Sequence, residues 1–242
     1  MGKSWRLSGA TLKAIAMVTM TIDHLAAALL LPLLSADTVP SWLSGLDLPR
    51  LYNLMRGIGR IAFPIFAFLL VEGLLLTRSK KKMGLRLLLV GLISEPFFDR
   101  ALMGSWVDWG HQNIFWTLLL AGLAIWAGEE VLRRGKHQAL RVVPLLLAMG
   151  IAQLTRVDYG AIGVAAIGFY WLFRGLPYGR VVATIAGYFG EAVLFWGSPL
   201  YVIPLLQAYD GTRGRQWKWL SYLFYPGHLA ILALAATRLY PA

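Results

Sequence analysis

The stretch that decides the fold lies near the N-terminus, where residues Leu12–Leu34 read LKAIAMVTMTIDHLAAALLLPLL. An α-helix rises about 1.5 Å per residue, so roughly 20 consecutive apolar residues cross the hydrocarbon core of a bilayer. The stretch therefore predicts a membrane-spanning helix. A cleaved signal peptide is the weaker interpretation, because Asp23 and His24 interrupt the apolar core.

The composition of the whole chain agrees with this first stretch. Hydrophobic residues make up 58% of the sequence and charged residues only 14%, with a mean hydropathy of +0.61. A soluble domain carries about 25% charged residues, so too little polar surface is present to cover a globule in water. The net charge of +11 would suggest nucleic-acid binding in a soluble protein. Here the basic residues fall in short loops between apolar runs, which favours a role in membrane orientation. The absence of cysteine excludes disulfides, thiol catalysis and thiolate metal sites.

Further apolar segments follow the first along the chain. They are Ile58–Leu76, Met83–Phe98, Ile114–Ala127, Val142–Leu154, Tyr159–Phe173, Val181–Ala208 and Trp219–Leu239. Gly197, Ser198 and Pro199 interrupt the run from Val181 to Ala208, which predicts a pair of short helices that meet there. We therefore expect an all-α, polytopic transmembrane helix bundle of about eight to nine hydrophobic segments, forming a single domain over residues 1–242.

Basic residues set the expected orientation in the membrane. Lys3 and Arg6 place the N-terminus in the cytoplasm, and the most basic loop, Arg78–Lys82, returns to the same side after two crossings. The polar stretch between Leu34 and Ile58 is then an outer loop, and the C-terminus is expected outside. A bacterial cytoplasmic (inner) membrane location follows as the prediction.

Ionisable groups within a bilayer are costly, so each one is a candidate for function. His24 lies about 18 Å along the first segment, in its outer half, and imidazole is suited to proton transfer near neutral pH. Asp23 points about 100° away from His24 on a helix, so we expect it to meet a cation on another helix, such as Arg60. A satisfied polar pair that joins helices is the alternative. His228, in the last segment, either lines the same cavity as His24 or caps an interior hydrogen bond.

Two glutamates and one basic stretch complete the candidates from the residues alone. Glu72 and Glu95 sit within helices and are expected to form structural pairs, with Arg86 near enough to serve. The basic loop Arg78–Lys82, with Arg86 beyond it, can hold a phosphorylated cytosolic ligand such as coenzyme A, or can act only in orientation. The sequence contains neither a metal-ligand cluster, a P-loop nor a Gly-x-Ser-x-Gly elbow. We therefore expect no metal and no nucleic-acid partner.

Several blocks, taken in order, make the chain resemble the TraX family, membrane proteins linked to N-terminal acetylation of conjugative pilin. The resemblance runs from the first segment to the last. The blocks are Met20–His24, Ile58–Phe68, Val71-Glu72-Gly73, Asn113-Ile114-Phe115, Asp158-Tyr159-Gly160 and Tyr222–Leu229. Each block alone is weak, and their order makes the set specific.

TraX-like proteins in turn look like a compact branch of the transmembrane acyltransferases, which are held to carry an acyl group from cytosolic acyl-coenzyme A to an acceptor outside. That resemblance implies a catalytic histidine in the first helix, which His24 matches. It also implies a basic stretch after the second helix and a Ser-Tyr-x-x-Tyr-x-x-His run, which Ser221–His228 resembles. Glu72 departs from the pattern, which has serine there.

We therefore predict an acetyl-coenzyme A-dependent acetyltransferase in which His24 is the general base for an amine or hydroxyl acceptor outside the membrane. The acceptor is open between a pilin N-terminus, an envelope glycan and a metabolite. The alternatives are a proton-coupled transporter of a small polar solute, against which no inverted repeat is visible, and a non-catalytic scaffold. The predicted site residues are His24 and Asp23 as catalytic, Arg60, Arg78, Lys82, Arg86, Tyr225 and His228 as donor-binding, and Glu72, Asn113, Asp158 and Tyr159 as substrate-binding or structural.

Overall fold

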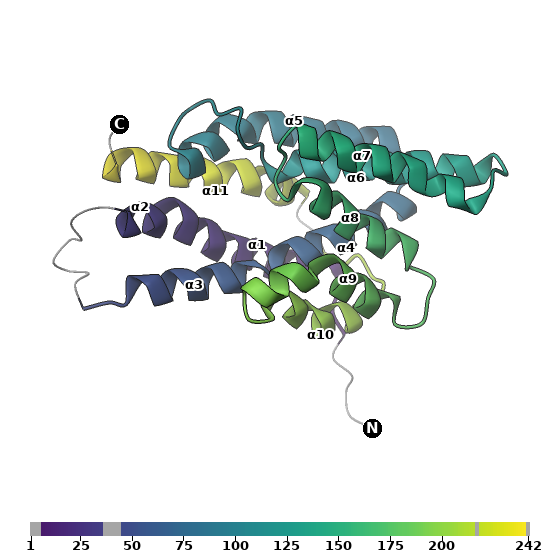
Figure 1. Ribbon diagram of the computed structural model, residues 1–242, viewed down its shortest axis with the longest axis horizontal. Coiled ribbons are helices and arrows are strands. Elements are labelled where there is room, and N and C mark those ends of the chain that lie inside the picture. The colour runs from purple at the N-terminus through teal and green to yellow at the C-terminus, as the bar shows by residue number, and fades with distance from the viewer. Residues whose placement is uncertain (1–5, 36–44, 216–217, 241–242) are drawn as a thin grey trace, which may run out of the picture. The chain divides into compact units, whose positions relative to one another are not determined.

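The computed structural model describes residues 6–35, 45–215 and 218–240. Within these residues the chain is helical, and its only β-type pairings are the isolated bridges Leu7–Tyr209 and Gln112–Val157. The predicted all-α fold is confirmed (Figure 1). Lys3 and Asp37 lie outside the described residues, as does the side chain of Ser221.

The longer helices follow the predicted apolar segments along most of the chain. They are α1 (Gly9–Leu25), α2 (Leu31–Leu34), α3 (Leu48–Gly59), α4 (Ala62–Leu76), α5 (Lys80–Phe98), α6 (Ile114–Arg133), α7 (Val143–Leu154), α8 (Gly160–Leu172), α9 (Gly179–Leu194), α10 (Val202–Gln207) and α11 (Lys218–Leu239). Short π-helical turns occupy Ala26–Leu30 and Asp99–Met103, and 3₁₀ turns occupy Gln138–Val142 and Ser198–Tyr201.

Helix α1 begins at an N-cap and ends in a widened turn. The side chain of Ser8 accepts a hydrogen bond from the Thr11 amide, which satisfies one of the amides left over at a helix start. After Leu25 the backbone passes into the π-helical turn Ala26–Leu30. Such turns are rare inside helices and often lie at functional sites. The hydroxyl of Tyr240 donates to the Leu29 carbonyl within this turn, at 2.7 Å.

The second segment begins earlier than its hydropathy predicted. Asp47 caps α3 by accepting from the Arg50 amide at 3.0 Å, and a proline follows within the first turn. The prediction of an outer loop up to Ile58 is therefore wrong from Leu48 onward. Arg50 and Arg56 made this part of the chain read as polar, although it is an amphipathic helix that continues into α4.

The interrupted run after Val181 breaks where expected. Gly197 has a φ of 78°, a left-handed conformation that favours glycine, and the 3₁₀ turn with Pro199 follows directly. The returning arm differs from the expectation, because α10 has six residues. At about 1.5 Å per residue it covers about 9 Å, far less than a bilayer core. On which side the C-terminus lies stays a prediction.

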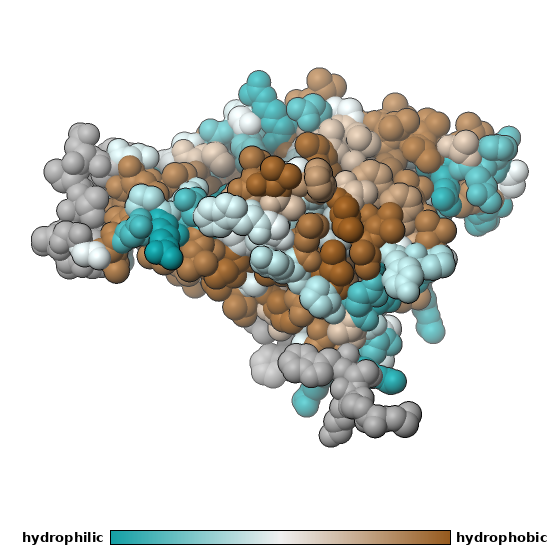
Figure 2. All heavy atoms as spheres, turned by 60° about the horizontal axis from the view of Figure 1, so that its bottom comes forward, coloured by the Kyte–Doolittle hydropathy of each residue, from teal (hydrophilic) through white to brown (hydrophobic). Residues whose placement is uncertain are grey.

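Apolar surface identifies the protein as a membrane protein. Three helical stretches are long and apolar enough to cross a bilayer, Gly9–Leu34, Leu48–Leu76 and Ile114–Arg133, and shorter apolar helices cover Gln138–Leu154 and Gly160–Leu172. Large hydrophobic side chains are exposed along several helices, and Figure 2 shows them over much of the face drawn. In water such surface would drive aggregation, whereas lipid tails cover it at no cost.

The described chain divides into two compact units. Unit one comprises residues 1–65, 96–108 and 190–242, and unit two comprises residues 66–95 and 109–189. In unit one α1 packs against α3 and α11, and in unit two α6, α7 and α8 pack against one another. The single domain expected from the sequence stays a prediction.

Candidate functional site

Two histidines far apart in the sequence meet in unit one. His24, in the last turn of α1, and His228, in α11, place Nδ1 and Nε2 respectively 2.7 Å apart. Their rings are nearly parallel, at an interplanar angle of 4°, and the ring centroids are 5.0 Å apart. The Nδ1 of His228 lies 2.9 Å from the Phe224 carbonyl oxygen, one turn earlier in α11. His228 therefore contacts His24 and also forms an interior hydrogen bond, which is the second of the two possibilities raised for it.

The Phe224 carbonyl fixes the direction of the two hydrogen bonds that link it to His228 and His228 to His24. A carbonyl oxygen only accepts, so Nδ1 of His228 carries the proton that points to Phe224. In neutral His228 the Nε2 is then the acceptor, and Nδ1 of His24 must donate to it. Neutral His24 therefore has a bare Nε2, which has no hydrogen-bond partner among the described residues. This nitrogen is available to take a proton.

Tyr225 forms an aromatic wall beside both imidazoles. Its ring stands edge-on to His24 and to His228, with centroid distances of 6.1 Å and 5.4 Å. The Tyr225 side chain is buried and the Phe224 ring stacks on His228 at 5.1 Å. These contacts fix the imidazole planes, so the pair is held in one geometry.

A network of charges surrounds Asp23, on the same helix as His24. Its Oδ2 accepts from Arg56 at 2.6 Å and its Oδ1 accepts from Arg60 at 2.7 Å. The pairing with Arg60 was expected from the sequence, and Arg56 was missed because its helix was read as a loop. Both carboxylate oxygens are engaged, so Asp23 holds the arginines and is not oriented toward His24.

Arg60 also links the network to α9. It donates to Glu191 at 2.9 Å, and its guanidinium lies 5.2 Å from the centre of the Phe195 ring. The network holds two arginines and two carboxylates, so its formal charge is zero, which lowers the cost of keeping it out of water. Sequence reasoning did not single out Glu191, although a lone carboxylate in an apolar run is the kind of signal that marks such a partner.

Gly59 allows α3 to approach α1 at this point. A Cβ built on Gly59 would collide with the Cβ, Cγ and Oδ1 atoms of Asp23. The residue is buried and lies directly before Arg60. Only glycine therefore lets both arginines of this segment reach the Asp23 carboxylate.

The other predicted residues lie in unit two, with structural partners of their own. Glu72 pairs with Arg174, at 2.7 Å between Oε1 and Nε, so Arg86 as its partner is wrong. Arg86 donates from Nε to the Lys82 carbonyl at 2.9 Å, and Arg78 is exposed.

Asn113 and its neighbours build the connection between α5 and α8 in unit two. The Asn113 side chain caps α6 through the Phe115 amide and donates to Glu95 at 2.7 Å, while Trp116 also donates to Glu95. The Asp158 carbonyl accepts from the Thr117 hydroxyl. Tyr159 has a φ of 61° and precedes α8. These contacts indicate a structural role for Asn113, Asp158 and Tyr159.

Comparison with known proteins gives a family match over residues 8–236, under the description TraX protein. The chain belongs to the TraX family. A TraX-like relative from Dichelobacter nodosus, named "Probable fimbrial assembly protein FimC, serogroup H1", is 26% identical over 263 residues, covering 97% of this chain and 98% of that protein. No solved structure matches the chain. The TraX match includes both histidines of the pair and the arginines bound to Asp23.

Proposed function

We propose that this TraX protein is an acetyltransferase of the bacterial inner membrane, which moves an acetyl group from cytosolic acetyl-coenzyme A to an amine or hydroxyl outside. The observation that carries the proposal is the bare Nε2 of His24 at the end of the chain Phe224 carbonyl–His228–His24. A base whose other ring nitrogen is held by a fixed acceptor is the arrangement used for proton abstraction in acyl transfer.

In the proposed reaction His24 carries one proton from the acceptor to the leaving thiolate. Nε2 of His24 removes a proton from the acceptor amine or hydroxyl while that atom attacks the thioester carbonyl. The new bond joins the acceptor to the acetyl carbon, the carbon–sulfur bond breaks, and His24 returns the proton to the departing thiolate. While His24 is an imidazolium, its Nδ1–H donates to Nε2 of His228, and a hydrogen bond to a charged donor is the stronger kind.

Asp23 acts in this proposal as a positioning residue. Arg56 and Arg60 both bind Asp23, the residue directly before His24, and two uncompensated cations there would disfavour a third positive charge on the base. The carboxylates of Asp23 and Glu191 offset these charges through contacts of 2.6–2.9 Å. The same pairs hold α1, α3 and α9 in register around the base.

A pilin N-terminus is the acceptor that the family and the relative support. The relative is named for fimbrial assembly, and a neutral terminal amine needs one base to lose one proton on acylation. His24 meets that requirement without a metal ion. A hydroxyl on an envelope glycan is the second acceptor of the same chemistry.

The test is transfer from radiolabelled acetyl-coenzyme A to a pilin N-terminal peptide by the purified full-length protein. His24→Ala should lower the rate about 10²- to 10⁴-fold, the usual contribution of a general base. The matched control is His137→Ala, since His137 is an exposed histidine in the connection before α7. Full activity of His24→Ala would overturn the assignment. Solute uptake driven by a pH gradient in proteoliposomes, without acetyl transfer, would favour a proton-coupled transporter.

A further inference from the structure

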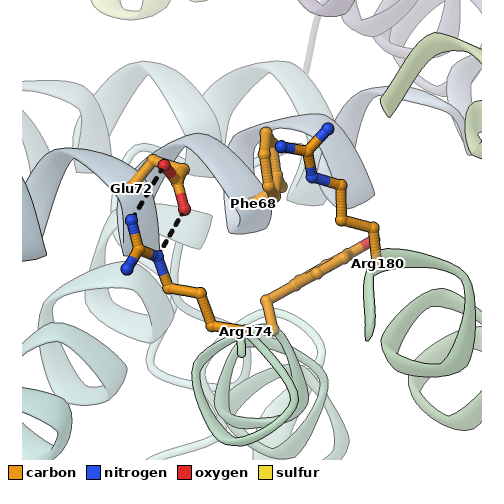
Figure 3. Close-up of a pocket in the computed structure, with 5 residues that line it drawn as sticks. Phe68, Glu72, Arg174 and Arg180 are labelled. Carbon is orange, nitrogen blue, oxygen red and sulfur yellow. Dashed lines mark hydrogen bonds and ion pairs between the residues drawn. The ribbon is translucent and has the colours of Figure 1, made fainter. Parts of the chain in front are cut away.

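A cavity of about 270 Å³ lies within unit two, and its lining residues are different from those of the histidine and arginine network described above. Its lining is Phe68, Glu72, Tyr170, Arg174 and Arg180, which we call the arginine pocket (Figure 3). Phe68 and Glu72 are one turn apart on α4 and so face the same way. Arg174 follows the end of α8, and Arg180 is the second residue of α9.

Glu72 fixes the plane of the Arg174 guanidinium. Its Oε1 accepts from Nε at 2.7 Å and its Oε2 accepts from Nη2 at 3.4 Å, as the dashed lines in Figure 3 show. The Glu72 side chain is 14% exposed and that of Arg174 is 44% exposed. The pair uses one edge of a planar group that carries five N–H donors, and a guanidinium can serve two anions at once. Glu72 therefore orients Arg174 at the mouth of the cavity.

Two contacts hold Arg180 in place, one at its guanidinium and one at its backbone carbonyl. Its guanidinium lies 5.2 Å from the centre of the Phe68 ring, and the two side chains lie beside each other in Figure 3. The Tyr170 hydroxyl is 2.9 Å from that of Thr184, which donates to the Arg180 carbonyl at 2.7 Å. Because the Thr184 proton goes to Arg180, Tyr170 donates to Thr184. The guanidinium and the backbone carbonyl of Arg180 are thus both held.

The charge and size of the cavity favour a phosphate group. Two arginines stand against one carboxylate, and the positive end of the α9 dipole adds to their field. The volume suits one or two phosphoryl groups, and it is below the range of about 300–1,000 Å³ that whole small-molecule ligands fill. The arginine pocket therefore fits the phosphate end of a larger molecule.

A second cavity, of about 560 Å³, also has Arg174 in its lining. It includes Trp171, over whose ring the Arg141 guanidinium lies at 5.3 Å, and Trp171 donates to Glu129 at 2.7 Å. Only 5% of Trp171 is exposed and Arg141 covers one face of its ring, so the second cavity adds another guanidinium beside Arg174. The two cavities share Arg174, so the arginine pocket borders a second cavity that also has an arginine in its lining.

We propose that the arginine pocket binds the phosphate end of a larger ligand, with Arg174 and Arg180 as the phosphate-binding residues. Where the ligand is the nucleotide portion of acetyl-coenzyme A, this rests on the proposed function. It places donor recognition at Arg174 and Arg180, in addition to the predicted stretch Arg78–Arg86. A phospholipid headgroup presents the same phosphate chemistry, and the experiment separates the two sources.

The experiment measures binding of coenzyme A by calorimetry to the full-length protein in maltoside detergent micelles, which carry no phosphate. Arg174→Gln and Arg180→Gln should each weaken binding by about 10- to 100-fold, the loss of one charge-assisted contact. The matched control is Arg133→Gln, since Arg133 is 75% exposed and pairs with Glu130 on its own helix. Helicity by circular dichroism checks that each variant folds, and Arg180→Lys should keep part of the affinity because it keeps the charge.

Several outcomes decide the proposal. Wild-type affinity in both glutamine variants would overturn it, as would a loss confined to Arg86→Gln. If coenzyme A does not bind and phosphatidylglycerol raises the thermal midpoint only when Arg174 and Arg180 are present, the phosphate comes from lipid and the nucleotide is excluded. His24→Ala should bind coenzyme A as tightly as wild type. Binding without acetyl transfer by the wild-type protein would leave the pocket standing and end the acetyltransferase proposal.

Discussion

Replacing His228 by phenylalanine isolates the contribution of the histidine pair to catalysis. Phenylalanine keeps the ring that stacks on Phe224 but removes the Nε2 acceptor, which is 2.7 Å from His24 Nδ1. The imidazolium form of His24 then loses a charge-assisted hydrogen bond, which contributes about 1.5–3 kcal/mol. Since about 1.4 kcal/mol corresponds to tenfold in rate, kcat should fall about 10- to 100-fold. The KM for acetyl-coenzyme A should stay the same.

The assay is the initial rate of labelled acetyl transfer, measured for single and double variants. If His228 acts through His24, then His228→Phe in a His24→Ala background should cause no further loss, because the base it supports is absent. His228→Gln offers a side-chain oxygen to His24 and should retain more activity than His228→Phe. Additive losses in the double variant, or a fully active His228→Phe, would refute the relay.

Three further predictions address the charge network and the loops. Asp23→Asn should destabilise the protein by about 3–5 kcal/mol because it leaves two arginines with Glu191 as their one carboxylate, and a thermal midpoint equal to wild type would contradict this. Gly59→Ala should lower both the thermal midpoint and the acetyl-transfer rate, since its Cβ meets Asp23, whereas Gly57→Ala on the same helix has ordinary contacts and should behave as wild type in both assays. Gly179→Ala should weaken coenzyme A binding because its Cβ meets the Phe173 carbonyl and displaces Arg180, while Gly150→Ala in α7, where a Cβ meets nothing within 4 Å, should not; equal binding by the two variants would show that the turn does not position the pocket.

The sequence predicted the features that local physics controls. Apolar length located most helices, and the Gly197–Pro199 break appeared where backbone conformation required it. The pairing of Asp23 with Arg60 was expected because a buried carboxylate needs a cation.

The sequence did not predict side-chain contacts that depend on tertiary packing. His24 and His228 are 204 residues apart, and Glu72 and Arg174 are 102 apart, so helical spacing carries no information about either contact. Arg56 was missed for a different reason: an amphipathic helix with arginines on one face has the hydropathy of a loop.

The π-helical turn that follows His24 has a practical consequence for the design of C-terminal reporter fusions. Within this turn the Leu29 carbonyl accepts a hydrogen bond from the hydroxyl of Tyr240, which follows the last residue of α11. The helix that carries the proposed base is therefore held by a hydrogen bond from Tyr240. Truncation before Tyr240 would remove that hydrogen bond. A reporter used to locate the C-terminus should therefore be joined after Ala242 through a flexible linker.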